Sequence, residues 1–319
     1  MDNVKTVRIG AVGISGRGSG MLGLMASIPG VIVPAVCDKV PERAENGIKI
    51  VKESEHYDGY EVHSYLDYKE MLAKEKLDAL LICTTWITHA MIAVDAMKAG
   101  CHVAFEVGGA ASIEECWNLV RTSEETGKFC MMLENCCYDY FEMNALSMKQ
   151  SGVFGEVIRA EGAYIHDLTP YWEAYWKNPN GTDPNGLGWR LKYNKEVRGD
   201  VYPTHGLGPV AQCLDILRGD RFTTLVAMDT RSIHGKELVS AKTGKPCNEF
   251  LNGDHTTTLL RTAQGKVIEV QHNVMSPQPY NRLFKLTGTK GYCTKYPYEQ
   301  LALNASTVQQ YVVVCDKNV

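Results

Sequence analysis

Short apolar runs alternate with amphipathic stretches along the first part of the chain. The apolar runs have the length and composition of buried strands and lie at residues 7–12, 31–37, 79–83, 102–105 and 129–133. Between them, apolar positions with helical spacing occur at residues 41–52, 88–99 and 112–126. Alternating strands and helices are typical of a parallel sheet covered by helices. We therefore predict a doubly wound α/β domain over residues 1–134, with about five or six parallel strands.

Longer runs of alternating polarity follow in the second part of the chain. This period of two is typical of antiparallel strands, and it occurs at residues 156–166, 224–233, 256–261, 266–273 and 282–287. A helical run is predicted from Val210 to Leu217. Residues 171–198 are rich in Pro, Gly, Asn and Trp without clear periodicity, which indicates a long functional loop. The pattern predicts a second, α+β domain over residues 135–319, with a largely antiparallel sheet.

A glycine-rich turn, Gly13–Gly18, connects the first predicted strand to a helix predicted over residues 21–27. It matches the pattern G-x-G-x-x-G, with Gly13, Ser15 and Gly18 at the three marked positions. Asp38 stands twenty residues after Gly18, at the end of the second apolar run. In a Rossmann domain the helix N-terminus binds the pyrophosphate and such an aspartate binds a ribose hydroxyl. The turn predicts a Rossmann domain that binds NAD in preference to NADP, although Arg17 could contact either phosphate or adenine.

The composition excludes several classes of protein. Apolar residues make up 45% and charged residues 22%, and no stretch has the length of a membrane span. The 33 basic and 37 acidic side chains are mixed, without the basic stripe that binds nucleic acid. We expect a small-molecule or glycan substrate, and neither a nucleic acid nor a membrane as partner.

The chain has 11 cysteines but no Cys-x-x-Cys pair and no His/Cys cluster with the spacing of zinc ligands. We therefore predict no metal site. Several of these cysteines fall in or beside apolar runs, where they would act as small buried hydrophobes, namely Cys37, Cys83, Cys101 and Cys130. Free thiols indicate a reducing compartment. Because the N-terminus runs straight into a strand, we expect a cytoplasmic protein.

Residues 200–209, Asp-Val-Tyr-Pro-Thr-His-Gly-Leu-Gly-Pro, contain the densest group of chemically useful side chains. Tyr202 and His205 stand three residues apart at a predicted junction of loop and helix, where they can converge on one ligand. A histidine suits proton exchange with a substrate hydroxyl during hydride transfer. The further candidates are Tyr164, His166, Arg190 and Tyr280.

Longer motifs resemble a known family. The glycine turn, residues 84–89, residues 99–103 and Glu106 are similar to the Gfo/Idh/MocA family of NAD(P)-dependent sugar and inositol dehydrogenases. A narrower resemblance is to the family 109 glycoside hydrolases, which are NAD-dependent α-N-acetylgalactosaminidases. It rests on Trp86–His89, Glu106–Val107, Leu133–Tyr138, Gly152–Glu156, Glu161–Asp167, Tyr202–Pro209, Arg218–Phe222 and Ser276–Arg282.

The narrower resemblance implies specific residue roles. Dinucleotide contacts are implied for Arg17, Gly18, Asp38, Trp86, His89, Glu106, Val107 and Asn135. Substrate contacts are implied for Tyr164, Arg190, Tyr202, His205 and Tyr280. The implied mechanism oxidises the sugar at C3, eliminates the C1 substituent, adds water and returns the hydride. Our hypothesis is that Tyr202 and His205 serve the C3 hydroxyl in this mechanism and that Tyr164 or Tyr280 works near C2.

Two departures from the family patterns bear on this interpretation. The dehydrogenases carry Glu-Lys-Pro where this chain has Glu106, Val107 and Gly108, and the loss of lysine argues against an ordinary dehydrogenase. The hydrolases continue with proline, so Gly108 also departs from them. They also extend further and carry a Gly-Gly-His-Gly-Gly segment near the substrate, so the end at Val319 implies that a late part of the site is absent.

Three functions therefore stay open at this point. The leading one is hydrolysis of an N-acetylgalactosaminide. A plain NAD-dependent sugar dehydrogenase and an NAD-binding protein without catalytic activity are the alternatives. Because the second-domain sheet of this family commonly pairs with another subunit, the resemblance also implies a homo-oligomer.

Overall fold

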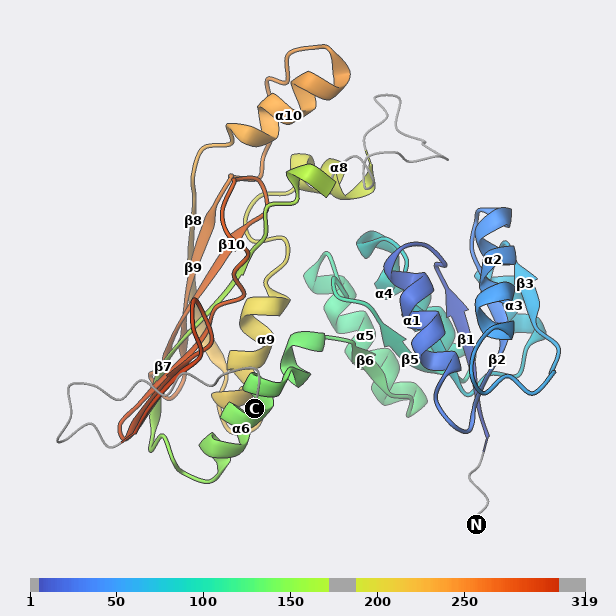
Figure 1. Cartoon of the computed structure of the whole chain (residues 1–319), viewed down its shortest axis with the longest axis horizontal. Helices are drawn as coiled ribbons and strands as arrows, with labels where there is room; N and C mark the ends of the chain where they lie inside the picture. Colours follow the sequence, from blue (N-terminus) through green and yellow to red (C-terminus); the bar gives the residue numbers. More distant parts are fainter. Residues whose placement is uncertain (1–5, 172–187, 304–319) are drawn as a thin grey trace. The chain divides into compact units, whose positions relative to one another are not determined.

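A computed structural model describes residues 6–171 and 188–303. The chain divides into two compact units, and the boundary lies between Leu133 and Glu134. Figure 1 shows a helix-covered sheet in the first unit and a larger sheet with helices in the second.

The first unit contains six parallel strands in the order β3-β2-β1-β4-β5-β6. These strands are β1 (Val7–Val12), β2 (Val31–Cys37), β3 (His63–Tyr65), β4 (Ala79–Ile82), β5 (His102–Phe105) and β6 (Cys130–Met132). The predicted doubly wound sheet is confirmed. Strand β3 was not predicted, because its three residues are exposed or half-buried and form no apolar run.

Helices cover both faces of this sheet. They are α1 (Arg17–Ala26), α2 (Pro41–Lys52), α3 (Tyr68–Lys74), α4 (Trp86–Lys98) and α5 (Ile113–Thr126). Successive strand residues point to opposite faces, so Leu81 packs in one buried cluster with α1 and α2, while Leu80 and Ile82 pack in another with α3, α4 and α5. Helix α1 begins at Arg17, four residues before its predicted start, so the glycine turn leads directly into a helix N-terminus.

The second unit contains a seven-stranded sheet in the order β13-β12-β11-β7-β10-β9-β8. These strands are β7 (Val157–Ile165), β8 (Phe222–Asp229), β9 (Thr256–Thr262), β10 (Val267–Asn273), β11 (Phe284–Gly288), β12 (Gly291–Thr294) and β13 (Gln300–Leu303). Only the pairing of β7 with β10 is parallel among these described strands. The predicted largely antiparallel sheet is therefore confirmed.

One face of this sheet is buried under helices. The helices of the unit are η1 (Asn135–Tyr138), α6 (Tyr140–Gln150), η2 (Thr169–Tyr171), α8 (Trp189–Glu196), α9 (Thr204–Cys213) and α10 (His234–Thr243). Helix α9 lies on β7 and α6 packs against α9, as Figure 1 shows. Leu260, Ile268, Ala160 and Leu286 form one row across the inner face and join the core with Val210 of α9.

Two predictions about this unit are wrong. The helix predicted over Val210–Leu217 begins at Thr204 and ends at Cys213, so His205 lies in its first turn and Pro209 lies inside it. Glycines at 206 and 208 and this proline made the segment look like a loop, since all three disfavour helix. The predicted loop over residues 171–198 contains α8, while its residues 172–187 lie outside the described part of the chain.

Ten cysteines fall in the described ranges, and all are free. Burial raises the pKa of Cys37, with a smaller contribution from the Asp38 charge, to about 12, as a packed thiol requires. No helix within residues 6–171 and 188–303 is long and apolar enough to cross a membrane.

Candidate active site

The carboxyl ends of the parallel strands gather most of the predicted cofactor residues. The glycine turn follows β1, Asp38 follows β2, Trp86 and His89 open α4 after β4, and Glu106 and Val107 follow β5. Sheets with this strand order bind dinucleotides at this edge, where the connections from β1 and β4 run in opposite directions. Asn135 belongs to the second unit, where it is the first residue of η1.

The glycine turn is built for close approach of the backbone. Gly13 has φ of +90°, and a Cβ there would lie 2.6 Å from the carbonyl oxygen of Cys83. A Cβ on Gly18 would lie 1.9 Å from the carbonyl oxygen of Gly13. Ser15, at the middle position, is exposed and needs no unusual backbone conformation. The N-cap residue of α1, Gly16, provides no side-chain cap, and a helix N-terminus of this kind suits a phosphate, although the Gly18 amide donates to the carbonyl oxygen of Ser15 at 3.0 Å.

Asp38 is buried at the end of β2 and is held by two backbone amides. Its Oδ2 accepts a hydrogen bond from the Ile14 amide at 2.8 Å, and its Oδ1 accepts one from the Val40 amide at 3.0 Å. Each carboxylate oxygen can accept a second bond, so the side chain is oriented and still able to bind a ribose hydroxyl. Arg17, the first residue of α1, donates through Nε to Glu106, which follows β5, at 2.8 Å.

The departure at Gly108 has a structural cause. Its φ is +90°, which proline cannot adopt, and a Cβ there would lie 2.2 Å from the Trp86 ring. Trp86 is buried, and so is Val107. His89 is fully buried too, and its Nε2 donates to the carbonyl oxygen of Thr84 at 2.9 Å. This bond fixes the start of α4, and a direct contact of His89 with a cofactor stays a prediction.

These features fit a bound dinucleotide. The turn brings backbone close to a helix N-terminus that lacks a side-chain cap, and Asp38 stands ready at the neighbouring strand end. Residues of the turn would hold the pyrophosphate and Asp38 the adenosine ribose.

All five predicted substrate residues lie in the second unit, and rings link them into one cluster. The Tyr164 ring centroid lies 4.9 Å from that of Tyr202 and 5.0 Å from that of His205. The Arg190 guanidinium, on α8, lies 5.1 Å from the centroid of the Tyr202 ring. Tyr280 joins through His166, whose ring lies 4.8 Å from it. The structure thus brings these residues together, and their roles stay predictions.

Glycine contacts place His205 against this cluster. A Cβ on Gly162 of β7 would lie 2.0 Å from the carbonyl oxygen of Gly206, so α9 touches the strand directly. A Cβ on Gly208 would lie 3.1 Å from Cγ of Glu134, so η1 also packs closely on α9. Gly206 and Gly208 lower the helix propensity of α9 and so hid it in the sequence pattern, but they also allow its first turn to approach Tyr164 and Glu134.

Three side chains that were not predicted as site residues surround His205. Its Nδ1 lies 2.7 Å from Glu134 Oε1 and 3.2 Å from the sulfur of Cys136, to which Arg282 donates at 2.6 Å. Burial and the Glu134 charge raise the pKa of the Cys136 thiol to about 12. Carboxylate, thiol and imidazole atoms within 4.8 Å of one another are a possible metal donor set. Because the Cys136 thiol is neutral and accepts a hydrogen bond from Arg282, these atoms fit a hydrogen-bonded network better than a metal site.

Two further histidines lie beside Tyr164. The Tyr164 hydroxyl lies 3.1 Å from His166 Nδ1, and His272 pairs with Tyr164 across the β7–β10 ladder. Burial lowers the pKa of His166, and the nearby arginine charges lower it further. Burial, with the charge of Arg190, lowers the pKa of His272 to about 3. Both rings are therefore neutral near pH 7, and neutral His166 can accept the phenolic proton of Tyr164.

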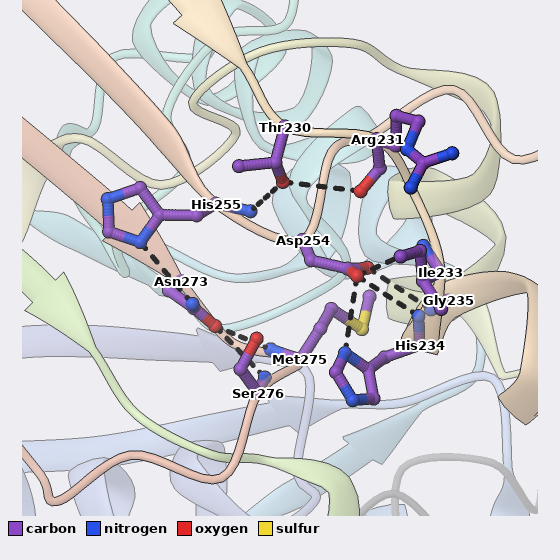
Figure 2. A network of polar contacts seen from close by, with 10 residues as sticks. All are labelled: Thr230, Arg231, Ile233, His234, Gly235, Asp254, His255, Asn273, Met275 and Ser276. Atoms are coloured by element: carbon purple, nitrogen blue, oxygen red, sulfur yellow. Dashed lines mark hydrogen bonds and ion pairs between the residues drawn. The ribbon is translucent and has the colours of Figure 1, made fainter.

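A polar network supports the segment that carries Tyr280. Figure 2 shows Asn273, the last residue of β10, with its Oδ1 directed at the amides of Met275 and Ser276, which donate at 3.1 and 3.0 Å. In the same network Asp254 accepts from the amides of Ile233, His234 and Gly235 and so caps α10. Asn273 thus fixes the direction in which the chain leaves the sheet toward Tyr280.

Comparison with known families agrees with this architecture. Residues 138–312 match the family described as glycosyl hydrolase 109, C-terminal domain. The chain belongs to glycosyl hydrolase family 109. Residues 7–134 match the oxidoreductase family with an NAD-binding Rossmann fold. The predicted families and the NAD-binding Rossmann domain are therefore confirmed.

Several curated family 109 proteins are among its relatives. Glycosyl hydrolase family 109 protein 3 of Phocaeicola vulgatus is 55% identical over 306 residues, which cover 96% of this chain and 56% of the relative. Protein 1 of Bacteroides thetaiotaomicron is 46% identical over 310 residues, covering 96% and 63%. The chain thus spans less than two thirds of the length of these relatives.

Solved structures share the fold of this family 109 chain. A myo-inositol 2-dehydrogenase from Lactobacillus plantarum matches with a TM-score of 0.69 and 17% identity, covering 97% of this chain and 82% of that chain. A levoglucosan dehydrogenase in complex with NADH and L-sorbose matches with a TM-score of 0.71 and 19% identity, covering 97% and 80%. At these identities the likeness establishes the two-unit fold.

Proposed function

We propose that this chain is an NAD-dependent glycoside hydrolase that acts on α-N-acetylgalactosaminides by transient oxidation at C3. The observation that carries the proposal is the cluster of His205, Tyr164 and Tyr202, in which a histidine held by a carboxylate faces two phenols. Histidine and tyrosine side chains can accept and donate the hydroxyl and C–H protons that this reaction transfers. An ordinary glycosidase instead places two carboxyl groups on either side of the scissile bond.

His205 takes the proton of the sugar C3 hydroxyl, and Tyr202 orients that hydroxyl. NAD, when bound, accepts the hydride from C3 and returns it at the end of the cycle. A ketone at C3 acidifies the C2 proton. Tyr164 gives its phenolic proton to His166 and takes the C2 proton. The C1 substituent then leaves. Water then adds at C1 and C2 regains a proton, so no net oxidation occurs.

Tyr280 suits a different task from that of Tyr164. Burial raises the pKa of Tyr280 to about 12, against the opposing charge of Arg282. A phenol with this pKa keeps its proton near pH 7, so Tyr280 donates a hydrogen bond to the substrate. We assign removal of the C2 proton to Tyr164, because its hydroxyl lies 3.1 Å from His166 Nδ1, which can accept the phenolic proton.

The test is release of 4-nitrophenol from its α-N-acetylgalactosaminide by the purified chain, with and without NAD, while the absorbance of NADH is followed. Phenol release that requires NAD and leaves no lasting NADH supports the proposal. NADH build-up on free sugar would show a sugar dehydrogenase, and absence of both signals would show an NAD-binding protein without this activity. Hydrolysis in D₂O adds a second check, because the proposed elimination incorporates deuterium at C2.

A further inference from the structure

Glu134 stands where the second unit begins, and its carboxylate serves two partners. It follows β6 in sequence, is the first residue of the second unit, and its side chain is 6% exposed. Its Oε1 accepts from the Cys136 amide at 2.9 Å and lies 2.7 Å from His205 Nδ1. The first bond caps η1 and fixes the carboxylate, and the second reaches the ring on α9.

The charge of Glu134 decides which nitrogen of His205 carries hydrogen. Burial on its own would raise the pKa of Glu134, but the hydrogen bonds from His205 and the Cys136 amide, with the attraction to His205, lower it overall. Glu134 is therefore ionised near pH 7 and can only accept. Its short contact with Nδ1 requires Nδ1–H, so a neutral His205 has its lone pair on Nε2.

Other charged and titratable groups around His205 do not replace this carboxylate. The Cys136 thiol is neutral because its pKa is about 12, and Arg282, bound to that sulfur, adds positive charge. From β7 and from the segment before α9, Tyr164 and Tyr202 contribute phenol rings. The positive charge of Arg282 opposes a second positive charge on His205, and Glu134 offsets it.

We propose that Glu134 is a positioning residue, which holds His205 as the Nδ1–H tautomer and stabilises the imidazolium that forms when Nε2 takes the substrate proton. This role rests on the proposed function for its kinetic consequence. The tautomer itself follows from the contacts of the second unit alone. It assigns a function to the Leu133–Tyr138 motif that the substrate contacts leave unexplained.

The kinetic test replaces Glu134 by glutamine, which keeps size and a hydrogen-bonding oxygen but removes the charge. We expect kcat for Glu134→Gln to fall about 100-fold with little change in KM, because the lost charge stabilises the imidazolium, which forms only after the substrate has bound. The acid limb of the pH–rate profile should also move to lower pH. Glu142→Gln is the matched control, since Glu142 is a buried glutamate that accepts from Lys295 instead of contacting His205. Unchanged kcat and an unchanged pH profile in Glu134→Gln would overturn the proposal.

The second test does not depend on turnover. Nitrogen-15 NMR of the histidine rings, with His205 assigned by comparison with His205→Gln, reports the tautomer directly. We expect Nδ1–H in the unmodified protein and a shift of the tautomer equilibrium in Glu134→Gln. An Nε2–H tautomer in the unmodified protein would refute the role of Glu134. Nδ1–H in a protein without glycosidase activity would instead uphold the positioning role and reject the proposed function.

Discussion

The His205 ring contacts a carboxylate through Nδ1 and lies against two tyrosine rings, 5.0 and 4.8 Å between centroids. We expect His205→Ala to lower the rate of phenol release by about 100- to 10,000-fold, because general base catalysis is worth that much. Fluorescence titration should show nearly unchanged NAD affinity, since every predicted cofactor residue except Asn135 lies in the first unit.

The control for this variant is His56→Ala, which removes an exposed imidazole from the first unit. It should leave both the rate and the NAD affinity as they are. Full turnover by His205→Ala would remove His205 from the proposed mechanism and leave Tyr202 as the group at the C3 hydroxyl.

The limits of sequence inference at the residue scale follow from distance along the chain. Tyr202 and His205 could be chosen because residue types and spacing within one motif suggest a shared ligand. Glu134 and Arg282 could not, since the contacts they make join residues 71 and 146 positions apart. The motifs that contain them, Leu133–Tyr138 and Ser276–Arg282, were the available signal. The complete burial of His89 was also invisible in its motif.

At the scale of elements, the network of Figure 2 has two parts: Asn273 holds the segment that leads to Tyr280, and Asp254 holds the start of α10. Asn273 is 1% exposed, and Asn273→Ala leaves the amides of Met275 and Ser276 without the side-chain oxygen that accepts from them. We expect a loss of stability of about 1–3 kcal/mol. We also expect a raised KM, because the segment that leads to Tyr280 loses its anchor. Chemical denaturation and steady-state kinetics measure the two effects.

Asp254→Ala is the matched control in the same network, because it removes three backbone contacts at the start of α10. It should lower stability with little change in KM. If both variants change KM equally, the network does not act on the site through the Tyr280 segment.

The elements themselves were predicted unevenly, for physical reasons. Strands β1, β2 and β5 have the predicted bounds because buried parallel strands form continuous apolar runs. Helices α8 and α10 are largely polar and were not predicted. Helix α9 was predicted several residues too far along the chain, because its glycines, which make close contacts with β7 and η1, lower its intrinsic helix propensity.

For the molecule as a whole, acid should weaken the second unit through Asp220. Burial tends to raise the pKa of Asp220, but bonds from Thr262, the amides of Arg221 and Gln264, and Lys266 lower it from 3.8 to about 2. A lowered pKa contributes stability that is complete above the unfolded value and is lost as pH falls from about 4 to about 2. Asp220→Asn should therefore lower Tm at pH 7, and the difference from the unmodified protein should shrink below pH 4.

Thermal unfolding from pH 7 to pH 2.5 measures this effect, with Asp58→Asn, an exposed site, as control. A difference in Tm that stays constant down to pH 2.5 would show that the ionised carboxylate of Asp220 does not stabilise the fold.

The outer face of the seven-stranded sheet bears on the predicted homo-oligomer. Strand register aligns Val226, Leu259, Glu269, Glu161 and Lys285 in one row across this face. The apolar end of the row is exposed, with Val226 at 56% and Leu259 at 46%. Toward the other end, Lys285 pairs with Glu161 at 2.9 Å. A two-fold axis would bring this face onto its copy, so that apolar residues meet and opposite charges can pair.

We therefore expect light scattering to give twice the chain mass at micromolar concentration and Val226→Glu to give the monomer, because a buried charge opposes association. NAD binding should persist in that variant, since Val226 lies in the second unit. Leu66→Glu, at an exposed apolar residue of the first unit, is the control and should remain dimeric. If the unmodified protein is a monomer under these conditions, the outer face has no second copy as its partner, and its apolar end at β8 and β9 requires another explanation.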